Sequence, residues 1–199
     1  MVANMARQAG NDDLEGHHEL PTDGRALTEI SVSATLHCLT GCAIGEISGM
    51  AIGTAAGMSN GLTIAISVAL AFLFGYALTS LPLLRAGLAL ATVIPIALAS
   101  DTLSILIMEI VDNVIMVVIP GALHAGLGDL LFWGSLSFAL AIAFVFAVPA
   151  NRWLIARGKG HAAVHRTGIH GGPSPRLVGA ITLAAFVFGS VVLIGEALD

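Results

Sequence analysis

Two stretches of the chain combine acidic and sulfur-containing side chains within otherwise apolar surroundings. The first is "LHCLTGCAIGEISGMAIGTAAG", residues 36–57, in which Cys38, Cys42, Glu46 and Met50 recur at every fourth position. At 100° per residue, these side chains lie along one slowly turning helical face. Thiol and thioether groups suit soft ions such as copper(I), and also zinc. His37 adds an imidazole, although it points about 100° away from Cys38.

The second stretch is "SDTLSILIMEIVDNVIMVV", residues 100–118, and its acids and methionines also gather on one side of a helix. The side chains within about 80° of one another are Asp101, Met108, Asp112 and Met116, with Glu109 close by and Asn113 further round. A carboxyl group near the bilayer centre costs about 2.5 kcal/mol or more. A hydrogen bond between membrane helices returns only about 0.6 kcal/mol. The pattern therefore favours a functional site over packing alone.

The composition indicates that both stretches lie in a membrane. Hydrophobic residues make up 56% of the 199 residues and charged residues only 11%, whereas soluble domains have about 25% charged residues. The net charge is −5 and no basic run suggests nucleic acid. The first thirty residues are polar, so we expect no cleavable signal peptide and a first hydrophobic span that stays in the membrane.

The hydrophobic segments predict an all-α, polytopic transmembrane helix bundle. About 20 apolar residues are needed to span a bilayer, and we expect five spans, over residues 30–58, 62–84, 101–119, 130–148 and 177–198. Residues 86–99 contain Pro95 and are short for a span, so they predict a re-entrant or half-helix segment before a helix that begins at Asp101. Residues 1–26 read as a flexible cytoplasmic tail and residues 27–199 as the membrane domain, with a basic, histidine-containing loop at 151–176.

The basic residues predict the orientation, because cytoplasmic loops accumulate lysine and arginine. With five spans, all eight basic residues fall on one side, and we expect a cytoplasmic amino terminus in a bacterial inner membrane. If residues 86–99 crossed fully, Arg7, Arg25 and Arg85 would move to the outside.

The two stretches are expected to meet, because Cys42 and Glu46 lie near the middle of one predicted span and Glu109 and Asp112 near the middle of another. Such a midplane site predicts binding or transport of a transition-metal cation, copper-like or zinc-like. The candidate ligands and charge partners are His37, Cys38, Cys42, Glu46, Met50, Met108, Glu109, Asp112, Asn113 and Met116. His161, His165 and His170 in the basic loop, and His17 and His18 in the tail, are either solvated or collect the ion; His124 reads as an ordinary loop residue.

Three other interpretations remain open. The acids could relay protons, because a medium of low dielectric constant and mutual repulsion favour their protonated forms. Glycines at every fourth position, namely Gly41, Gly45, Gly49, Gly53 and Gly57, form a ladder that lets another helix approach closely; this would suit a structural or assembly module that packs against a partner subunit or a second copy. A redox enzyme ranks last, because the spacing of Cys38 and Cys42 on one helix would strain a disulfide, so the sequence favours a protein that is not an enzyme.

The segments "TLHCLTGCAIGEISGMAIG" and "MEIVDNVIM" resemble an uncharacterised bacterial membrane family, the domain of unknown function DUF4396. The resemblance covers about residues 30–150, and its most specific element is the H-C-x-x-G-C motif of His37, Cys38, Gly41 and Cys42. It implies that His37, Cys38, Cys42, Glu46, Glu109, Asp112 and Asn113 belong to one motif set. Some members of the family are labelled copper-related, and the resemblance extends this label to the present chain only as an association. The family name adds no established activity.

Overall fold

A computed structural model describes residues 24–165 and 175–198, and these ranges contain helices and no strand. The elements are α2 (Gly24–Ala55), α3 (Asn60–Arg85), α4 (Leu90–Val118), the 3₁₀ turn η1 (Ala122–His124), α5 (Leu130–Ala156), α6 (Ala162–His165) and α7 (Pro175–Leu198). Five of the helices are long and apolar enough to cross a bilayer. The prediction of an all-α bundle with five spans is therefore confirmed.

The outer surface of the bundle is apolar, as lipid contact requires. Leu73, Val117 and Ile181 have 59%, 59% and 55% of their surface exposed, which would be costly in water but not in hydrocarbon. The helices end where glycine allows a left-handed conformation. Gly57 (φ 61°) follows α2 and Gly87 (φ 88°) follows α3, and in each case the next amide bonds back to a carbonyl five residues earlier.

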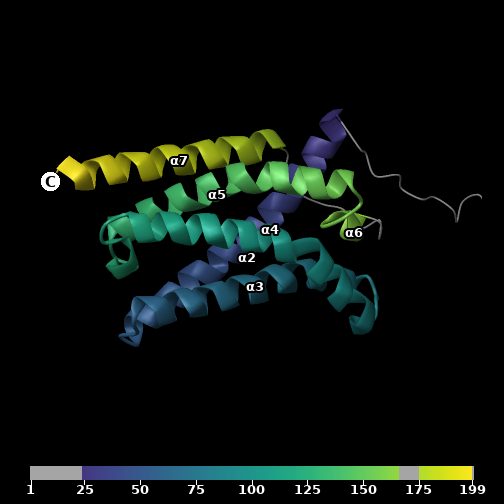
Figure 1. Ribbon diagram of the computed structural model, residues 1–199, viewed down its shortest axis with the longest axis horizontal. Coiled ribbons are helices and arrows are strands. Elements are labelled where there is room, and N and C mark those ends of the chain that lie inside the picture. The colour runs from purple at the N-terminus through teal and green to yellow at the C-terminus, as the bar shows by residue number, and fades with distance from the viewer. Residues whose placement is uncertain (1–23, 166–174, 199) are drawn as a thin grey trace, which may run out of the picture.

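Helix α2 holds the bundle together. It runs obliquely behind α5 and α4 toward α3 (Figure 1), and it contacts α3, α4, α5 and α7. Its glycine ladder fits against α3, where a Cβ atom placed on Gly45 would lie 2.2 Å from the backbone nitrogen of Ala71. Gly41, Gly49 and Gly53 meet Gly75, Ser67 and Thr63 in the same way. The expected close packing of this face against protein is thus confirmed, and the partner is α3 of the same chain.

The predicted half-helix is not a separate element. Residues 90–99 form the first turns of α4, which continues through Pro95 to Val118. The prediction that Asp101 begins a helix is wrong, since Asp101 lies inside α4 with none of its surface exposed. Membrane helices tolerate proline because neighbouring groups satisfy the freed carbonyl, and Pro82 and Pro149 likewise lie inside α3 and α5.

The predicted basic loop begins later than residue 151. Helix α5 passes Pro149 and continues to Ala156, and Asn151 is buried there, where it donates hydrogen bonds to Thr35 and Ser104. A one-turn helix, α6, follows at Ala162–His165. The buried Asn151 explains the difference, because its bonds to α2 and α4 hold the last turns of α5 against the bundle.

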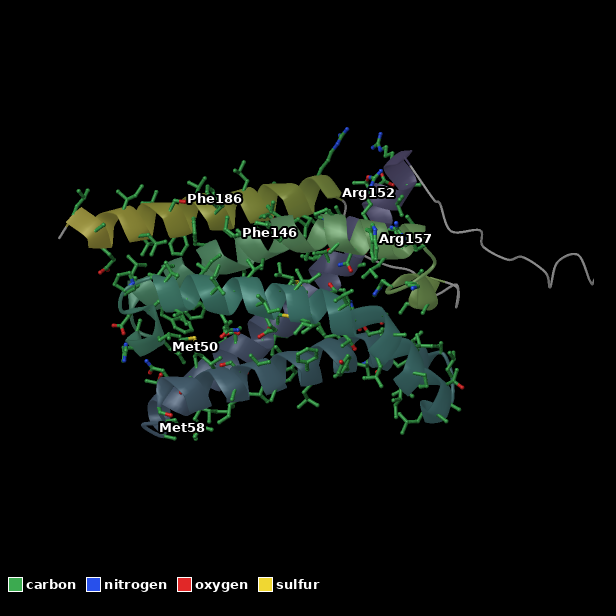
Figure 2. All side chains as sticks on the ribbon, in the orientation of Figure 1. Met50, Met58, Phe146, Arg152, Arg157 and Phe186 are labelled. Atoms are coloured by element: carbon green, nitrogen blue, oxygen red, sulfur yellow. The ribbon has the colours of Figure 1, made fainter. Side chains whose placement is uncertain are left out.

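The basic residues of the described part of the chain lie at one end of the bundle, called the basic end below. They are Arg25 at the start of α2, Arg85 at the end of α3, Arg152, Arg157 and Lys159 around the end of α5, and Arg176 at the start of α7. Figure 2 shows Arg152 and Arg157 at this end and Met58 toward the other. The arrangement of the helices therefore places the described basic residues at one end of the bundle, as the five-span prediction requires. Arg7 and Arg166 lie outside the described residues.

Candidate functional site

The polar ladder of α2 faces the interior of the bundle. Cys38, Cys42 and Glu46 have 1%, 1% and 2% of their surface exposed. On α4, Glu109 and Asp112 are 3% and 1% exposed. The two predicted stretches therefore share one protein-lined interior, and none of these groups faces lipid.

Three acids from α2 and α4 meet in what we call the carboxyl cluster: Glu46, Glu109 and Asp112, with Asn113 and Cys42 at its edge. Glu46 lies beside both Glu109 and Asp112, and the Cys42 thiol lies beside Glu109. The Asn113 Nδ2 atom is 3.4 Å from Glu46 Oε1 and 3.4 Å from Glu109 Oε2. This nitrogen is also 2.9 Å from the Glu109 carbonyl oxygen, so its two hydrogens are shared among three acceptors.

The carboxyl cluster has more acceptors than donors. Among the described residues, no donor reaches either carboxyl oxygen of Asp112 or the Oε1 atom of Glu109. Charged carboxylates buried together repel one another and lose their hydration. The cluster must therefore hold protons, which the acids can share, or a cation.

A second group, called the Asp101 cluster below, lies nearer the basic end and contains His37, Cys38, Asp101 and His161. The Cys38 Sγ atom is 3.6 Å from Asp101 Oδ1, and His161 Nδ1 is 3.3 Å from the same oxygen. The ring centroids of His37 and His161 are 5.9 Å apart. His161 comes from the segment between α5 and α6 and keeps 12% of its side chain exposed, so this cluster borders on solvent.

The predicted ligand set is thus divided between two places. Along α2, Glu46 follows Cys38 by two turns, and along α4, Asp112 follows Asp101 by three turns. At 1.5 Å per residue, these intervals separate the clusters by about 12–16 Å. Cys42 lies between them.

The predicted methionines occupy two environments. Met108 packs with Cys38, Cys42 and Ile105, close to the polar groups. Met50 and Met116 instead lie in an apolar cluster with Phe132 and Leu136, farther from the basic end. Met50 follows Glu46 by four residues on α2, and Met116 follows Asp112 by four residues on α4. Neither thioether lies among the acids.

Several residues of the interior were absent from the predicted set. They are Asp101, taken for a helix start; Asn151, assigned to a loop; His161, read as a loop residue that either is solvated or collects the ion; and Thr35 and Ser104, which accept the hydrogen bonds of Asn151. The spacing carried a signal for Ser104, because it lies four residues before Met108 on the same face. No local pattern showed that Asn151 and His161 would reach these helices.

In their present arrangement, no three His, Cys, Asp or Glu side chains of the described part of the chain form a group ready to hold a metal ion. Both cysteines are free thiols. The polar groups bond to one another, so a metal ion would have to displace protons or hydrogen bonds from them.

The opposite end of the bundle contains a surface pocket of about 310 Å³. His124, Asp129 and Glu196 line it, from η1, the following loop and the end of α7. The Nε2 atom of His124 is 3.3 Å from Asn60 Nδ2, and Asp129 accepts a hydrogen bond from the amide of Gly126. Of the remaining histidines, His17, His18 and His170 lie outside the described residues, as does the side chain of His165.

Residues 29–160 match the family model described as Domain of unknown function (DUF4396). The chain belongs to the DUF4396 family. The match includes both predicted stretches, and it confirms the resemblance read from the H-C-x-x-G-C motif. No curated protein and no solved structure matched. His161 follows directly after the matched region, so the Asp101 cluster joins DUF4396 residues to one residue beyond them.

Proposed function

We propose that this DUF4396 protein binds a transition-metal cation at the carboxyl cluster and moves it through the membrane. The observation that carries the proposal is the excess of buried carboxyl oxygens at Glu109 and Asp112, which have no donor among the described residues. A cation is the partner that such a pocket lacks. Ionisable groups inside membrane bundles typically mark ion pathways.

The chemistry of the donors favours a divalent ion of the zinc class over copper(I). Glu46, Glu109 and Asp112 supply hard oxygen ligands, and Cys42 supplies one sulfur. Zinc accepts mixed oxygen and sulfur ligands, whereas copper(I) prefers thiolates and thioethers. Two of the three methionines lie in the apolar cluster, which weakens the case for copper.

The test is metal binding by the purified protein in detergent. The protein is stripped with a chelator, dialysed against zinc, and its bound zinc is measured by mass spectrometry. The Glu46→Gln, Asp112→Asn double variant keeps the shape of both side chains but removes two charges, and it should lose the ion held by the carboxyl cluster. The matched control is Glu29→Gln, since Glu29 is an exposed acid paired with Arg25. Equal zinc content in all three proteins would reject the metal proposal.

A proton relay is the second candidate, and the closeness of Glu46 to Glu109 and Asp112 favours it specifically. Neighbouring carboxyl groups can share and pass protons without any metal. In vesicles containing a pH-sensitive dye, Glu46→Gln should abolish proton flux if this candidate is correct. Flux that is the same in Glu46→Gln and the unmodified protein would exclude it.

The orientation forms part of the proposal. The positive-inside rule assigns the basic end to the cytoplasm, so the carboxyl cluster is reached from the cytoplasm past the Asp101 cluster. The protein would then lie in a bacterial inner membrane. Labelling of single cysteines introduced at the exposed positions Lys159 and Gly128 by an impermeant reagent tests this, and only the cysteine at 128 should react from outside.

A further inference from the structure

We infer that the Asp101 cluster is the proton port of the carboxyl cluster: His161 exchanges protons with water at the basic end and passes them to Asp101, from which they reach Glu109. The inference deepens the proposed function, on which it rests only in that both concern the carboxyl cluster. A cation that binds protonated acids displaces their protons, and acids that relay protons must receive them. Either candidate function therefore needs a route for protons.

The surroundings of the carboxyl cluster differ toward the two ends of the bundle. Toward the opposite end, Met50 and Met116 pack with Phe132 and Leu136, and none of these side chains has a hydrogen-bonding proton. Toward the basic end, the interior instead contains buried polar and thiol groups, namely Thr35, Cys38, Asp101, Ser104 and Asn151. Proton access is therefore favoured from the basic end.

His161 connects this polar interior with water. Its side chain is 12% exposed, whereas that of Asp101 is fully buried. The Nδ1 atom of His161 lies 3.3 Å from Asp101 Oδ1, and the ring of His37 lies beside it, with the centroids 5.9 Å apart. An imidazole can take up a proton at one ring nitrogen and release one from the other. His161 thus has the position and the chemistry of a proton carrier.

Asp101 can receive a proton and pass it on, because its two oxygens have different surroundings. Oδ1 lies between His161 and the Cys38 Sγ atom, which is 3.6 Å away. Oδ2 is buried, and no donor of the described residues reaches it. A buried acceptor without a donor costs about 1–3 kcal/mol. A proton on Asp101 removes the charge and lowers this cost, so the carboxyl group is a suitable station for a proton.

The intervals beyond Asp101 are bridged by the two thiols. Cys38 and Cys42 pack in one cluster, and one turn of α2, about 6 Å, separates them along the helix. Cys42 lies beside Glu109 of the carboxyl cluster. The interval between the thiols is the longest on the route, so the thiols divide the 12–16 Å between the clusters into shorter steps.

The transfer conserves protons and needs no co-reactant other than water. A hydronium ion gives a proton to one ring nitrogen of His161, and the Nδ1 proton moves to the Asp101 carboxylate. Exchange with water then restores the first tautomer of the ring. Each thiol accepts one proton as it releases its own, and the proton of Cys42 passes to the Glu109 carboxylate. Protons leave the carboxyl cluster by the same steps in reverse.

The experiment follows deuterium exchange in the purified, chelator-treated full chain by infrared spectroscopy. The C=O band of a protonated carboxyl group shifts when deuterium replaces its proton, and the part of the band lost in Glu46→Gln, Asp112→Asn belongs to the carboxyl cluster. His161→Gln keeps a donor for Asp101 but cannot carry a proton. It should slow the exchange about tenfold or more, since a positioned proton carrier typically contributes about 100-fold or more. His124→Ala, at the opposite end, should not slow it.

His161→Ala separates proton transfer from a structural role. It should exchange as slowly as His161→Gln, and imidazole added to the medium should restore the rate, because the free ring can take the vacated place. If His161→Ala does not fold, His161→Gln decides alone. Unchanged exchange in His161→Gln, slow exchange in a folded His161→Ala that imidazole does not restore, or the absence of a carboxyl band from the cluster overturns the inference.

Zinc content distinguishes failure of the port from failure of the proposed function. Both His161 variants should bind as much zinc as the unmodified protein. If none of these proteins binds zinc but the exchange depends on His161, the proposed function fails and the port stands. If zinc binds and the exchange does not depend on His161, the port fails and the proposed function stands.

Discussion

The carboxyl cluster and the Asp101 cluster are built on the same two helices but differ in how their acids are satisfied. Asp101 accepts a hydrogen bond from a thiol and has an imidazole beside it. Asp112 has no donor at either oxygen among the described residues. The difference comes from a third element, because the segment before α6 brings His161 to Asp101, whereas no comparable donor reaches Asp112.

The comparison of Asp101 with Asp112 shows how a buried aspartate can have two different effects on stability. A buried acid with donors stabilises the fold. A buried acid without donors destabilises the empty protein and is stabilised by the ion itself. We therefore expect neutral substitutions at the two acids to change stability in opposite directions.

The largest effect should come from disrupting the contact between α2 and α3, because this contact positions the residues of both clusters. Gly45→Leu places side-chain atoms where the backbone of Ala71 lies, since even a Cβ atom would be 2.2 Å from its nitrogen. Helices α2 and α3 would have to separate, and both clusters would lose their geometry. We expect loss of the folded protein, measured as aggregation on size-exclusion chromatography in detergent.

The control for this prediction is Gly61→Ala, because nothing lies within 4 Å of a Cβ atom placed on Gly61. This variant should be monodisperse and equal to the unmodified protein in stability. If Gly45→Leu is as well folded as Gly61→Ala, the ladder does not hold α2 against α3.

Asp101→Asn should have the next largest effect. The amide keeps the shape but removes the charge that accepts the Cys38 hydrogen bond and attracts His161. The loss should lower the free energy of unfolding of the ion-free protein by about 1–3 kcal/mol. Thermal unfolding in detergent measures it, and a melting temperature at or above that of the unmodified protein would contradict the account of this cluster.

Asp112→Asn should have a smaller effect of opposite sign. Its amide hydrogens would add donors to a pocket with surplus acceptors on Glu46 and Glu109. We expect the ion-free protein to be stabilised by about 1 kcal/mol. Saturating zinc should stabilise this variant less than the unmodified protein, so that the order of the two melting temperatures reverses.

Tyr76→Phe provides the smallest effect and a reference outside both clusters. The Tyr76 hydroxyl is 2.8 Å from that of Thr102, on an exposed side of the bundle. Its loss should cost about 0.6 kcal/mol, as is typical of hydrogen bonds in membranes, and should leave zinc binding unchanged. A change in zinc content here would mean that the binding assay reports general stability and not the sites.

The sequence predicted the parts of this structure that follow from periodicity. The four-residue spacing from Cys38 to Met50 placed these side chains on the buried face of α2, and the hydropathy predicted the five spans. Pro95 and Asp101 misled the assignment of α4, because proline and aspartate usually mark a helix boundary. Inside this span, tertiary partners satisfy Asp101, which Cys38 and His161 contact, and membrane helices tolerate proline.

The residue spacing gives the distance between the two clusters along the helices, but the composition of the Asp101 cluster could not be predicted from it. It depends on how far α5 extends and where its following segment turns, which brings Asn151 to Thr35 and Ser104 and His161 to Asp101. These contacts join residues far apart in the sequence, and the helical pattern of one segment holds no information about them.

The central claim is that buried acids and a thiol of the carboxyl cluster hold a cation. The direct measurement is the zinc X-ray absorption spectrum of the His161→Ala variant, which keeps every residue of the carboxyl cluster. We predict one sulfur ligand at about 2.3 Å and oxygen ligands at about 2.0–2.2 Å, with the sulfur signal absent after Cys42→Ser. A shell of oxygen alone that is unchanged by Cys42→Ser and Asp112→Asn would contradict the account.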